Sequence, residues 1–218
     1  GQGFAEQIDA LSAAIDAASH NTGITARLVV TSLRNAGAEV ALEAARACRD
    51  LKNPYVAGFG LVGDESVDSL LDYEEALAVA YHEAGLGLVP HVGEQRIGNA
   101  LDYLQVIPDE ALADPTGSRA LRVGHGTLTH RSKELMNIYA DHGICFEVCL
   151  SANNRIGVPT DAQCLDMAQS ANSHDGQLVV RVDKACNRYF HDLGSRPLPD
   201  FVAAGIPVCL GSDNPLLM

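Results

Sequence analysis

Short apolar runs alternate with longer stretches of helical periodicity along this chain of 218 residues. Each run ends in glycine or polar residues, which is typical of a buried strand. The six runs are Arg27–Ser32, Tyr55–Leu61, Gly87–Pro90, Ala120–Val123, the run from Gly143 to Cys149, and Ile206–Leu210. Helical segments between strands favour parallel pairing, because parallel strands need a long crossover connection. The pattern therefore predicts an α/β fold.

Apolar residues three or four positions apart predict the helices between these strands. The expected helices are Ala5–Ser19, Ala36–Leu51, Tyr73–Ala84, Asn99–Gln105, Lys133–Asp141, Asp161–Ser170 and Pro199–Ala204. Two polar segments, Ile107–Ser118 and Ser151–Thr160, are expected to be loops, and Leu178–Val182 is a weaker apolar run. No internal repeat or domain linker is visible, so we expect a single domain.

The charge balance disfavours two classes of partner. With 28 acidic and 15 basic residues the formal net charge is −13, whereas nucleic acids and anionic membranes bind clustered Lys and Arg. There is no apolar run near the ~18 residues of a membrane-spanning helix and no visible signal peptide. None of the six cysteines forms a C-x-x-C pair, which favours reduced thiols in a cytoplasmic protein.

Polar segments follow four of the predicted strands. They are His91–Glu94, Arg122–Gly126, Cys145–Cys149 and Gly211–Pro215. The carboxyl ends of parallel strands meet at one edge, which is where β/α barrels carry their active sites. The pattern thus predicts a barrel whose histidines and carboxylates converge on one metal-assisted reaction centre.

His91, Glu94 and His125 are the strongest candidates for chemistry. An imidazole at a strand end can bind a metal, and Glu94 places an acid beside it. His125 lies between two glycines, where an imidazole that titrates near neutrality can activate water. Structural alternatives are a helix cap or turn for His91 and Glu94, and a core histidine bonded to a carbonyl for His125.

Three other residues near strand ends have both functional and structural interpretations. Asp213 could ligate a cation, although Ser-Asp-Asn-Pro is also ordinary turn chemistry. Gly63 could offer its backbone N–H to a ligand. Glu147 stands within an apolar run, and we expect it to form a structural ion pair with Arg122 or Arg155.

The order of these motifs resembles that of the adenosine deaminase family, in the amidohydrolase superfamily. The family motifs D-L-x-G-x-E, H-A-G-E, R-[IV]-G-H-G, C-P-x-S-N and T-D-D-P resemble Gly60–Glu65, His91–Glu94, Arg122–Gly126, Cys149–Asn153 and Ser212–Pro215. The resemblance implies a TIM (β/α)8 barrel with about six of its eight strands here. Residues 1–218 would then be one domain, an internal portion that lacks the N-terminal strands and C-terminal helices.

The resemblance also implies one Zn²⁺ per active site and a role for each candidate. His91 and Asp213 are expected to bind the zinc. Glu94 is expected to protonate the purine ring, and His125 to orient or deprotonate the zinc-bound water and stabilise the oxyanion. The expected purine contacts are Gly63 and Asn214.

The chain departs from the family pattern in three ways. It has no H-x-H, the first-strand pair that supplies two zinc ligands in the family. An H-x-H upstream of Gly1 would support the enzyme, and other residues there would support a binding module. Asn214 replaces the usual second Asp, and its amide donates a hydrogen bond without needing a bound proton. Arg196 precedes Pro197 where many members have His. These changes indicate a divergent branch.

The predicted function is zinc-dependent deamination of a 6-aminopurine, most simply adenosine to inosine and ammonia. One alternative is the same chemistry on adenine, AMP or aminodeoxyfutalosine. The other is a catalytically inactive deaminase-like module used for binding, which the missing H-x-H supports. The expected partner is a small purine nucleoside or base, not a nucleic acid or a membrane.

Overall fold

The computed structural model describes residues 3–113, 119–156 and 197–213. Its strands are β1 (Leu28–Leu33), β2 (Val56–Val62), β3 (Gly87–Leu88), β4 (His91–Val92), β5 (Arg122–His125), β6 (Cys145–Val148) and β7 (Val208–Leu210). They pair in parallel and in chain order, β1-β2-β3 in one sheet and β4-β5-β6-β7 in the other. Their carboxyl ends therefore share one edge.

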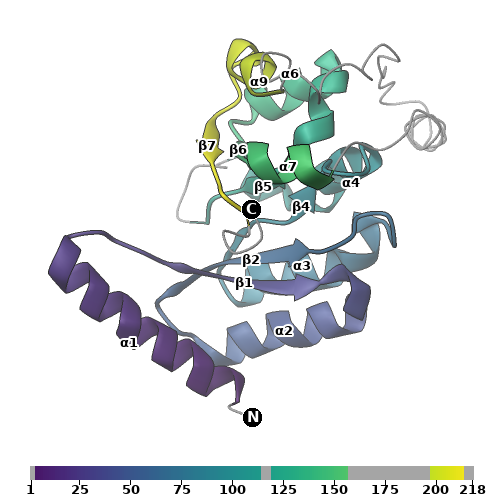
Figure 1. Cartoon of the computed structure of the whole chain (residues 1–218). Coiled ribbons are helices and arrows are strands. Elements are labelled where there is room, and N and C mark those ends of the chain that lie inside the picture. Colours follow the sequence, from purple (N-terminus) through teal and green to yellow (C-terminus); the bar gives the residue numbers. More distant parts are fainter. Residues whose placement is uncertain (1–2, 114–118, 157–196, 214–218) are drawn as a thin grey trace.

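β3 and β4 are two halves of one strand that is interrupted at Pro90. Val89 donates its N–H to the carbonyl of Phe59 in β2 at 2.8 Å, whereas the carbonyl of Pro90 accepts the N–H of Gly124 in β5 at 2.9 Å. Leu88 already forms a parallel bridge with Leu121, so this strand has β2 on one side and the β5 segment on the other. The two sheets are thus consecutive parts of one curved sheet (Figure 1).

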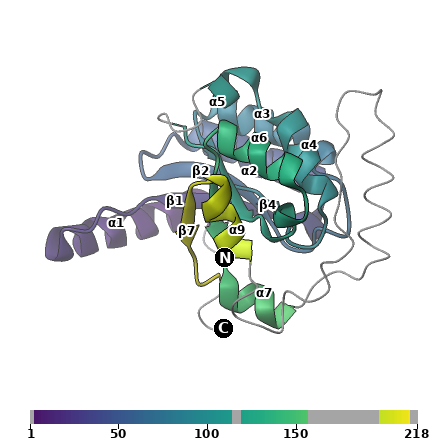
Figure 2. The same cartoon turned by 90° about the horizontal axis from the view of Figure 1, so that it is seen from above.

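Helices connect the strands and cover the sheet. They are α1 (Phe4–Thr22), α2 (Ala38–Leu51), α3 (Glu74–Ala78), α4 (Gly98–Val106), α5 (Asp109–Ala113), α6 (Lys133–Asp141), α7 (Leu150–Ile156) and α9 (Pro197–Ala204). α1 extends away from the other elements (Figure 2) and buries only Ile8 and Ser12. None of the described helices combines the length and the apolarity needed to cross a bilayer.

An aromatic cluster fixes β6 against its covering helices. The ring of Phe146 in β6 lies between Tyr139 of α6 and Phe201 of α9, with both centroid separations at 5.0 Å and both contacts edge-to-face. All three side chains are fully buried. Edge-to-face aromatic pairs stabilise a core beyond their area burial, so the cluster holds β6 against α6 and α9.

The structure agrees with the six predicted strand passes, but the loop assigned to Ile107–Ser118 was wrong over residues 109–113, and residues 114–118 lie outside the described part. Residues 109–113 form α5 instead. The carbonyl of Pro108 accepts the N–H groups of Ala111 and Leu112, which starts the helical turn, and Ala111 is buried. Proline is well tolerated at the start of a helix, where its missing N–H has no partner to lose.

The second predicted loop, Ser151–Thr160, was wrong over its first half, which belongs to α7. The N–H of Asn153 donates to the carbonyl of Cys149 at 3.0 Å, so the helix begins directly after β6. The segment Cys145–Cys149, expected to follow a strand, is largely the strand β6 itself. The predicted helix Asp161–Ser170 and the run Leu178–Val182 lie outside the described residues.

Candidate active site

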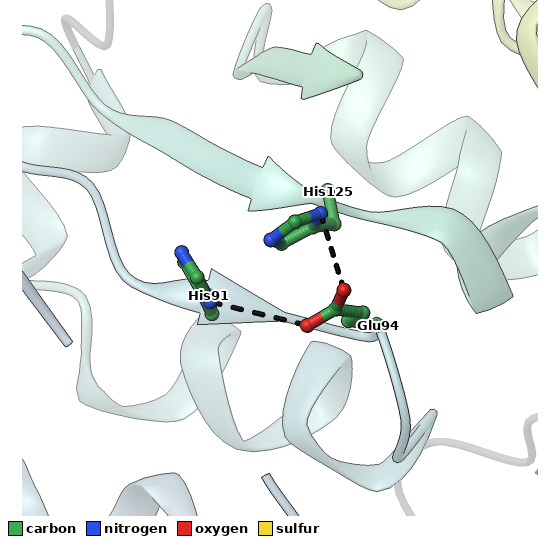
Figure 3. Close-up of side chains that lie close together, drawn as sticks. All are labelled: His91, Glu94 and His125. Carbon is green, nitrogen blue, oxygen red and sulfur yellow. Dashed lines mark ion pairs between the residues drawn. The ribbon is translucent and has the colours of Figure 1, made fainter. Parts of the chain in front are cut away.

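Three predicted side chains converge at the carboxyl edge of the sheet. Ligand atoms of His91, Glu94 and His125 all lie within 4.8 Å of one another (Figure 3). His91 begins β4 and His125 ends β5, and the register pairs Val92 with His125. The two imidazole rings are 4.3 Å apart and perpendicular. Of the predicted set, these three form a compact cluster.

Two glycines make this close approach possible. A Cβ on Gly124 would lie 2.8 Å from the Cδ2 atom of His91, and one on Gly126 would lie 2.4 Å from the ring of Phe146. Gly126 also has a φ of +66°, and so does His125. A left-handed φ is uncommon for a residue other than glycine and often marks a functional site. The backbone here is shaped to present the imidazole.

Glu94 sits in surroundings that favour its neutral form. Burial raises the pKa of its carboxyl to about 8, and the negative charges of Glu65 and Asp213 act in the same direction. The amide of Asn153 opposes them by donating to Oε1 at 2.9 Å. A carboxylic acid with such a pKa holds its proton near neutral pH and can deliver it to a substrate.

His91 is available as a metal ligand. Burial lowers its pKa to about 3, with His125 and the Arg34 guanidinium acting in the same direction, so the ring is neutral. Its Nδ1 atom is buried and has no hydrogen-bond partner. A neutral imidazole with a buried, unpartnered ring nitrogen is a ligand that suits a borderline divalent cation. The residues present therefore fit a divalent metal.

The site depends on two residues that sequence reasoning did not single out. The carboxylate of Glu65 is fully buried and accepts the backbone N–H groups of Glu94, Gln95 and Arg96, all at 3.1 to 3.2 Å. Asn153 contacts both Glu94 and His125. Each ends a motif, D-L-x-G-x-E or C-P-x-S-N, and that is the signal that could have found it.

Behind His91 lies a buried arginine, Arg34. Its guanidinium donates to the carbonyl oxygen of His91 at 2.9 Å and pairs with Asp68 at 3.0 Å. The hydroxyl of Tyr73 bonds to the same Asp68 carboxylate and to the carbonyl of Arg34. This network connects the strand that bears the histidine to the loop after β2.

The other predicted site residues lie at the edges of this cluster. Asp213 follows β7 with a φ of +59°, and its charge acts on the pKa of Glu94 and of His125, but it is exposed and is not part of the three-residue cluster. Gly63 directly follows β2 with a φ of +98°. Asn214 lies outside the described residues.

Glu147 makes one of the two ion pairs that were expected of it. Its carboxylate bonds to Arg122 at 2.8 Å, from neighbouring strands. Both side chains are partly exposed, so solvent screens the pair and its contribution to stability is small. The side chain of Arg155 lies outside the described part.

A family model described as adenosine deaminase matches residues 2–169. The chain belongs to the adenosine deaminase family. Among curated relatives, an adenine deaminase of Mesorhizobium japonicum is 32% identical over 211 residues, which cover 95% of this chain and 51% of that protein. This family member therefore spans about half the length of the curated relatives it matches.

Solved structures show the same fold. A crystal structure of adenine deaminase from Arthrobacter aurescens has a TM-score of 0.63 at 21% identity and covers 94% of this chain and 49% of that one. The crystal structure of an amidohydrolase from Burkholderia ambifaria, with bound Zn, has a TM-score of 0.66 at 21% identity. The match covers 100% of this chain and 49% of that one. The family match and the similarity to these structures together show that this chain has the TIM-barrel fold of the amidohydrolases, as predicted.

Proposed function

We propose that the protein catalyses the zinc-dependent hydrolytic deamination of a 6-aminopurine. The observation that carries the proposal is the cluster of His91, Glu94 and His125 at the carboxyl edge of a parallel sheet in an adenosine deaminase family member. Addition of water to the amine-bearing carbon needs an acid for the ring nitrogen and a polarised oxygen nucleophile. The cluster offers groups suited to both tasks.

His91 is proposed as a zinc ligand from this chain, and Asp213 as another. The unpartnered Nδ1 and the neutral ring of His91 support the first assignment. The negative charge that Asp213 contributes to the site supports the second. Zinc, when bound, acts as a Lewis acid that lowers the pKa of water towards neutrality.

Glu94 is proposed as the proton donor. As hydroxide adds to the amine-bearing carbon, electrons move to the adjacent ring nitrogen, which takes the proton from the Glu94 carboxyl. The added hydroxyl then gives its proton to the amine, the C–N bond breaks, and ammonia leaves as the carbonyl forms. The raised pKa of this carboxyl, about 8, supports the assignment, because the acid form is then present at neutral pH. Its backbone is held by Glu65, so the carboxyl is pre-positioned.

His125 is proposed to orient the attacking water and stabilise the oxygen charge that develops. Its perpendicular packing on His91 supports this role, because it places one imidazole beside the proposed metal ligand. Gly63 and Asn214 are proposed to contact the purine ring. The position of Gly63 after β2, at the same sheet edge, supports its part.

The substrate is the finer part of the proposal. The motifs alone predicted adenosine, whereas the relative from Mesorhizobium japonicum and the structure from Arthrobacter aurescens are both named adenine deaminase. Those names favour the free base. Adenine and adenosine differ by the ribose at the purine N9 atom, so a pocket that closes around that position accepts only the first.

The test uses the natural full-length protein loaded with zinc. Ammonia release is measured with adenine, adenosine and AMP, together with hypoxanthine, inosine or IMP as products. Turnover of any of them supports deamination, and the ratio of kcat/KM values identifies the substrate. Binding without turnover supports the inactive module instead. The variant Glu94→Gln is expected to lose turnover and keep its zinc, and a fully active variant removes Glu94 as the donor.

A further inference from the structure

Asn153 in α7 contacts two residues of the proposed site, Glu94 and His125. It lies in the first turn of α7, directly after β6, and its side chain is buried. Its amide nitrogen is 2.9 Å from Oε1 of Glu94 and 3.1 Å from Nδ1 of His125. Its amide oxygen is 3.0 Å from the hydroxyl of Thr127. All three neighbours are buried as well.

These contacts orient the amide of Asn153. The amide nitrogen has two hydrogens, and it faces a carboxyl oxygen and a ring nitrogen, both of which can accept. In the observed orientation its nitrogen donates to Oε1 of Glu94 and its oxygen accepts from the hydroxyl of Thr127. The amide therefore donates to Glu94 and His125 and accepts from Thr127.

A ring nitrogen that accepts a hydrogen bond carries no hydrogen. In the neutral imidazole, one nitrogen is a donor and the other an acceptor, and the bond made by one fixes the state of the other. With Nδ1 of His125 accepting from Asn153, the hydrogen is on Nε2. This second nitrogen lies on the side of the ring that faces His91 (Figure 3).

We propose that Asn153 is a positioning residue that holds His125 in its Nε2–H tautomer, so that His125 donates a hydrogen bond to the reacting oxygen instead of removing a proton from it. The catalytic part rests on the deaminase function proposed above, whereas the tautomer does not. No proton passes through His125: the nucleophile adds as hydroxide, its proton already released to solvent, and the ring keeps its hydrogen. The Nε2–H donor stabilises the negative charge that develops on this oxygen when the hydroxyl of the adduct gives its proton to the departing amine.

The deciding variant is Asn153→Asp, which keeps the size and shape of the side chain. It replaces the two N–H donors by a carboxylate oxygen that can only accept from His125. The ring is then expected to move its hydrogen to Nδ1, leaving Nε2 as an acceptor. Loss of one donor to a developing oxyanion lowers kcat by about a hundredfold. Because the variant also removes the amide donor to Oε1 of Glu94, a fall in kcat supports the proposal only together with the change of tautomer.

The experiment records long-range ¹H–¹⁵N spectra of the full-length, zinc-loaded protein labelled with ¹⁵N-histidine, and assigns the signals with His125→Asn. The wild type is expected to show an Nε2–H tautomer and Asn153→Asp an Nδ1–H tautomer, with equal zinc content. Asn153→Ala, which only removes the donor, is expected to give a mixture. Asn99→Asp is the matched control, because Asn99 is a buried asparagine on α4 that makes no contact with His125.

A wild-type Nδ1–H tautomer, or an unchanged tautomer and kcat in Asn153→Asp, overturns the proposal. So does an equal effect of Asn99→Asp on the tautomer, because the effect would then be general to core asparagines. The predicted tautomers in a protein that deaminates no 6-aminopurine would instead leave the assignment of Asn153 standing and refute the proposed function. The two failures are therefore distinguishable.

Discussion

The carboxylate of Glu65 accepts the backbone N–H of Glu94 through both of its oxygens, at 3.2 and 3.1 Å. One of these oxygens also accepts the N–H groups of the next two residues. A fully buried acid thus takes three backbone donors from the loop that carries the proposed proton donor. Burial raises the pKa of Glu65, and the Arg34 charge and the three donors oppose that shift.

Removal of this acid is expected to unfold the loop around Glu94. Glu65→Ala leaves three backbone N–H groups without their acceptor, and each buried unpaired donor costs about 1–3 kcal/mol. We expect a loss of more than about 2 kcal/mol in the free energy of unfolding, measured with urea, and a fall in kcat. Glu75→Gln is the control, since Glu75 is exposed and its pair with Arg46 is weak. Equal stability of the two variants would contradict the anchoring role.

Arg34→Lys is expected to weaken the structure behind His91. The guanidinium bonds to two acceptors at once, Asp68 and the carbonyl of His91, and a single ammonium cannot reproduce that planar fork. We expect a loss of about 1–3 kcal/mol in the free energy of unfolding and a weaker hold on zinc, measured by competition with a chelator. Arg46→Lys, at an exposed pair, serves as the comparison. An unchanged zinc affinity in Arg34→Lys would show that the hydrogen bonds of Arg34 do not contribute to metal binding.

The strand ends could be read from the sequence because their signals are local. His91 and His125 each follow a short apolar run, and the alternation with helices places both at one edge of a parallel sheet. Their convergence then follows from topology alone. The sequence predicted that this strand ends at Pro90, whereas it continues through His91 and Val92 as β4.

The supporting residues could not be read in the same way because their roles depend on contacts between distant segments. Glu65 bonds to residues about thirty positions further along, and Asn153 bonds to Glu94 across 59 positions. Asn153 also lay in a segment expected to be a loop, whereas it belongs to a helix that starts directly after β6. Polar composition predicted a surface loop, and burial against the site overrode that preference.

Gly126→Ala is expected to disrupt the end of β5. The residue has a φ of +66°, and a Cβ there would lie 2.4 Å from the ring of Phe146, which is itself packed between Tyr139 and Phe201 and cannot move freely. Overpacking and a left-handed alanine together cost about 2–4 kcal/mol. The measurement is the midpoint of thermal or urea unfolding.

Gly98→Ala is the matched control for that prediction. Gly98 begins α4, and a Cβ there would meet nothing within 4 Å. Alanine has a higher helix propensity than glycine, by up to about 1 kcal/mol, so this variant is expected to be as stable as the wild type or more so. A Gly98→Ala variant as unstable as Gly126→Ala would remove the steric explanation.

His130 is expected to make the protein less stable in acid. Burial lowers the pKa of its imidazole in the folded state, and the positive charge of Arg131 acts in the same direction. The hydrogen bond between its Nδ1 and the carbonyl of Thr127 and the negative charge of Asp200 oppose this shift. The unfolded chain titrates near pH 6.5, so below that pH unfolding takes up a proton that the folded state excludes. The stability that His130 contributes is therefore present above about pH 6.5 and is lost as the pH falls towards the folded pKa.

The slope of this loss approaches about 1.4 kcal/mol per pH unit for one proton. His130→Asn removes the titrating group and keeps an amide N–H near the position of Nδ1, so the variant is expected to show a shallower fall in the free energy of unfolding between pH 7 and pH 5. His91 and His125 also have lowered pKa values and are unchanged in both proteins, so the difference between the two slopes isolates His130. Identical slopes in urea titrations across this range would show that His130 binds its proton equally well in the folded and unfolded states.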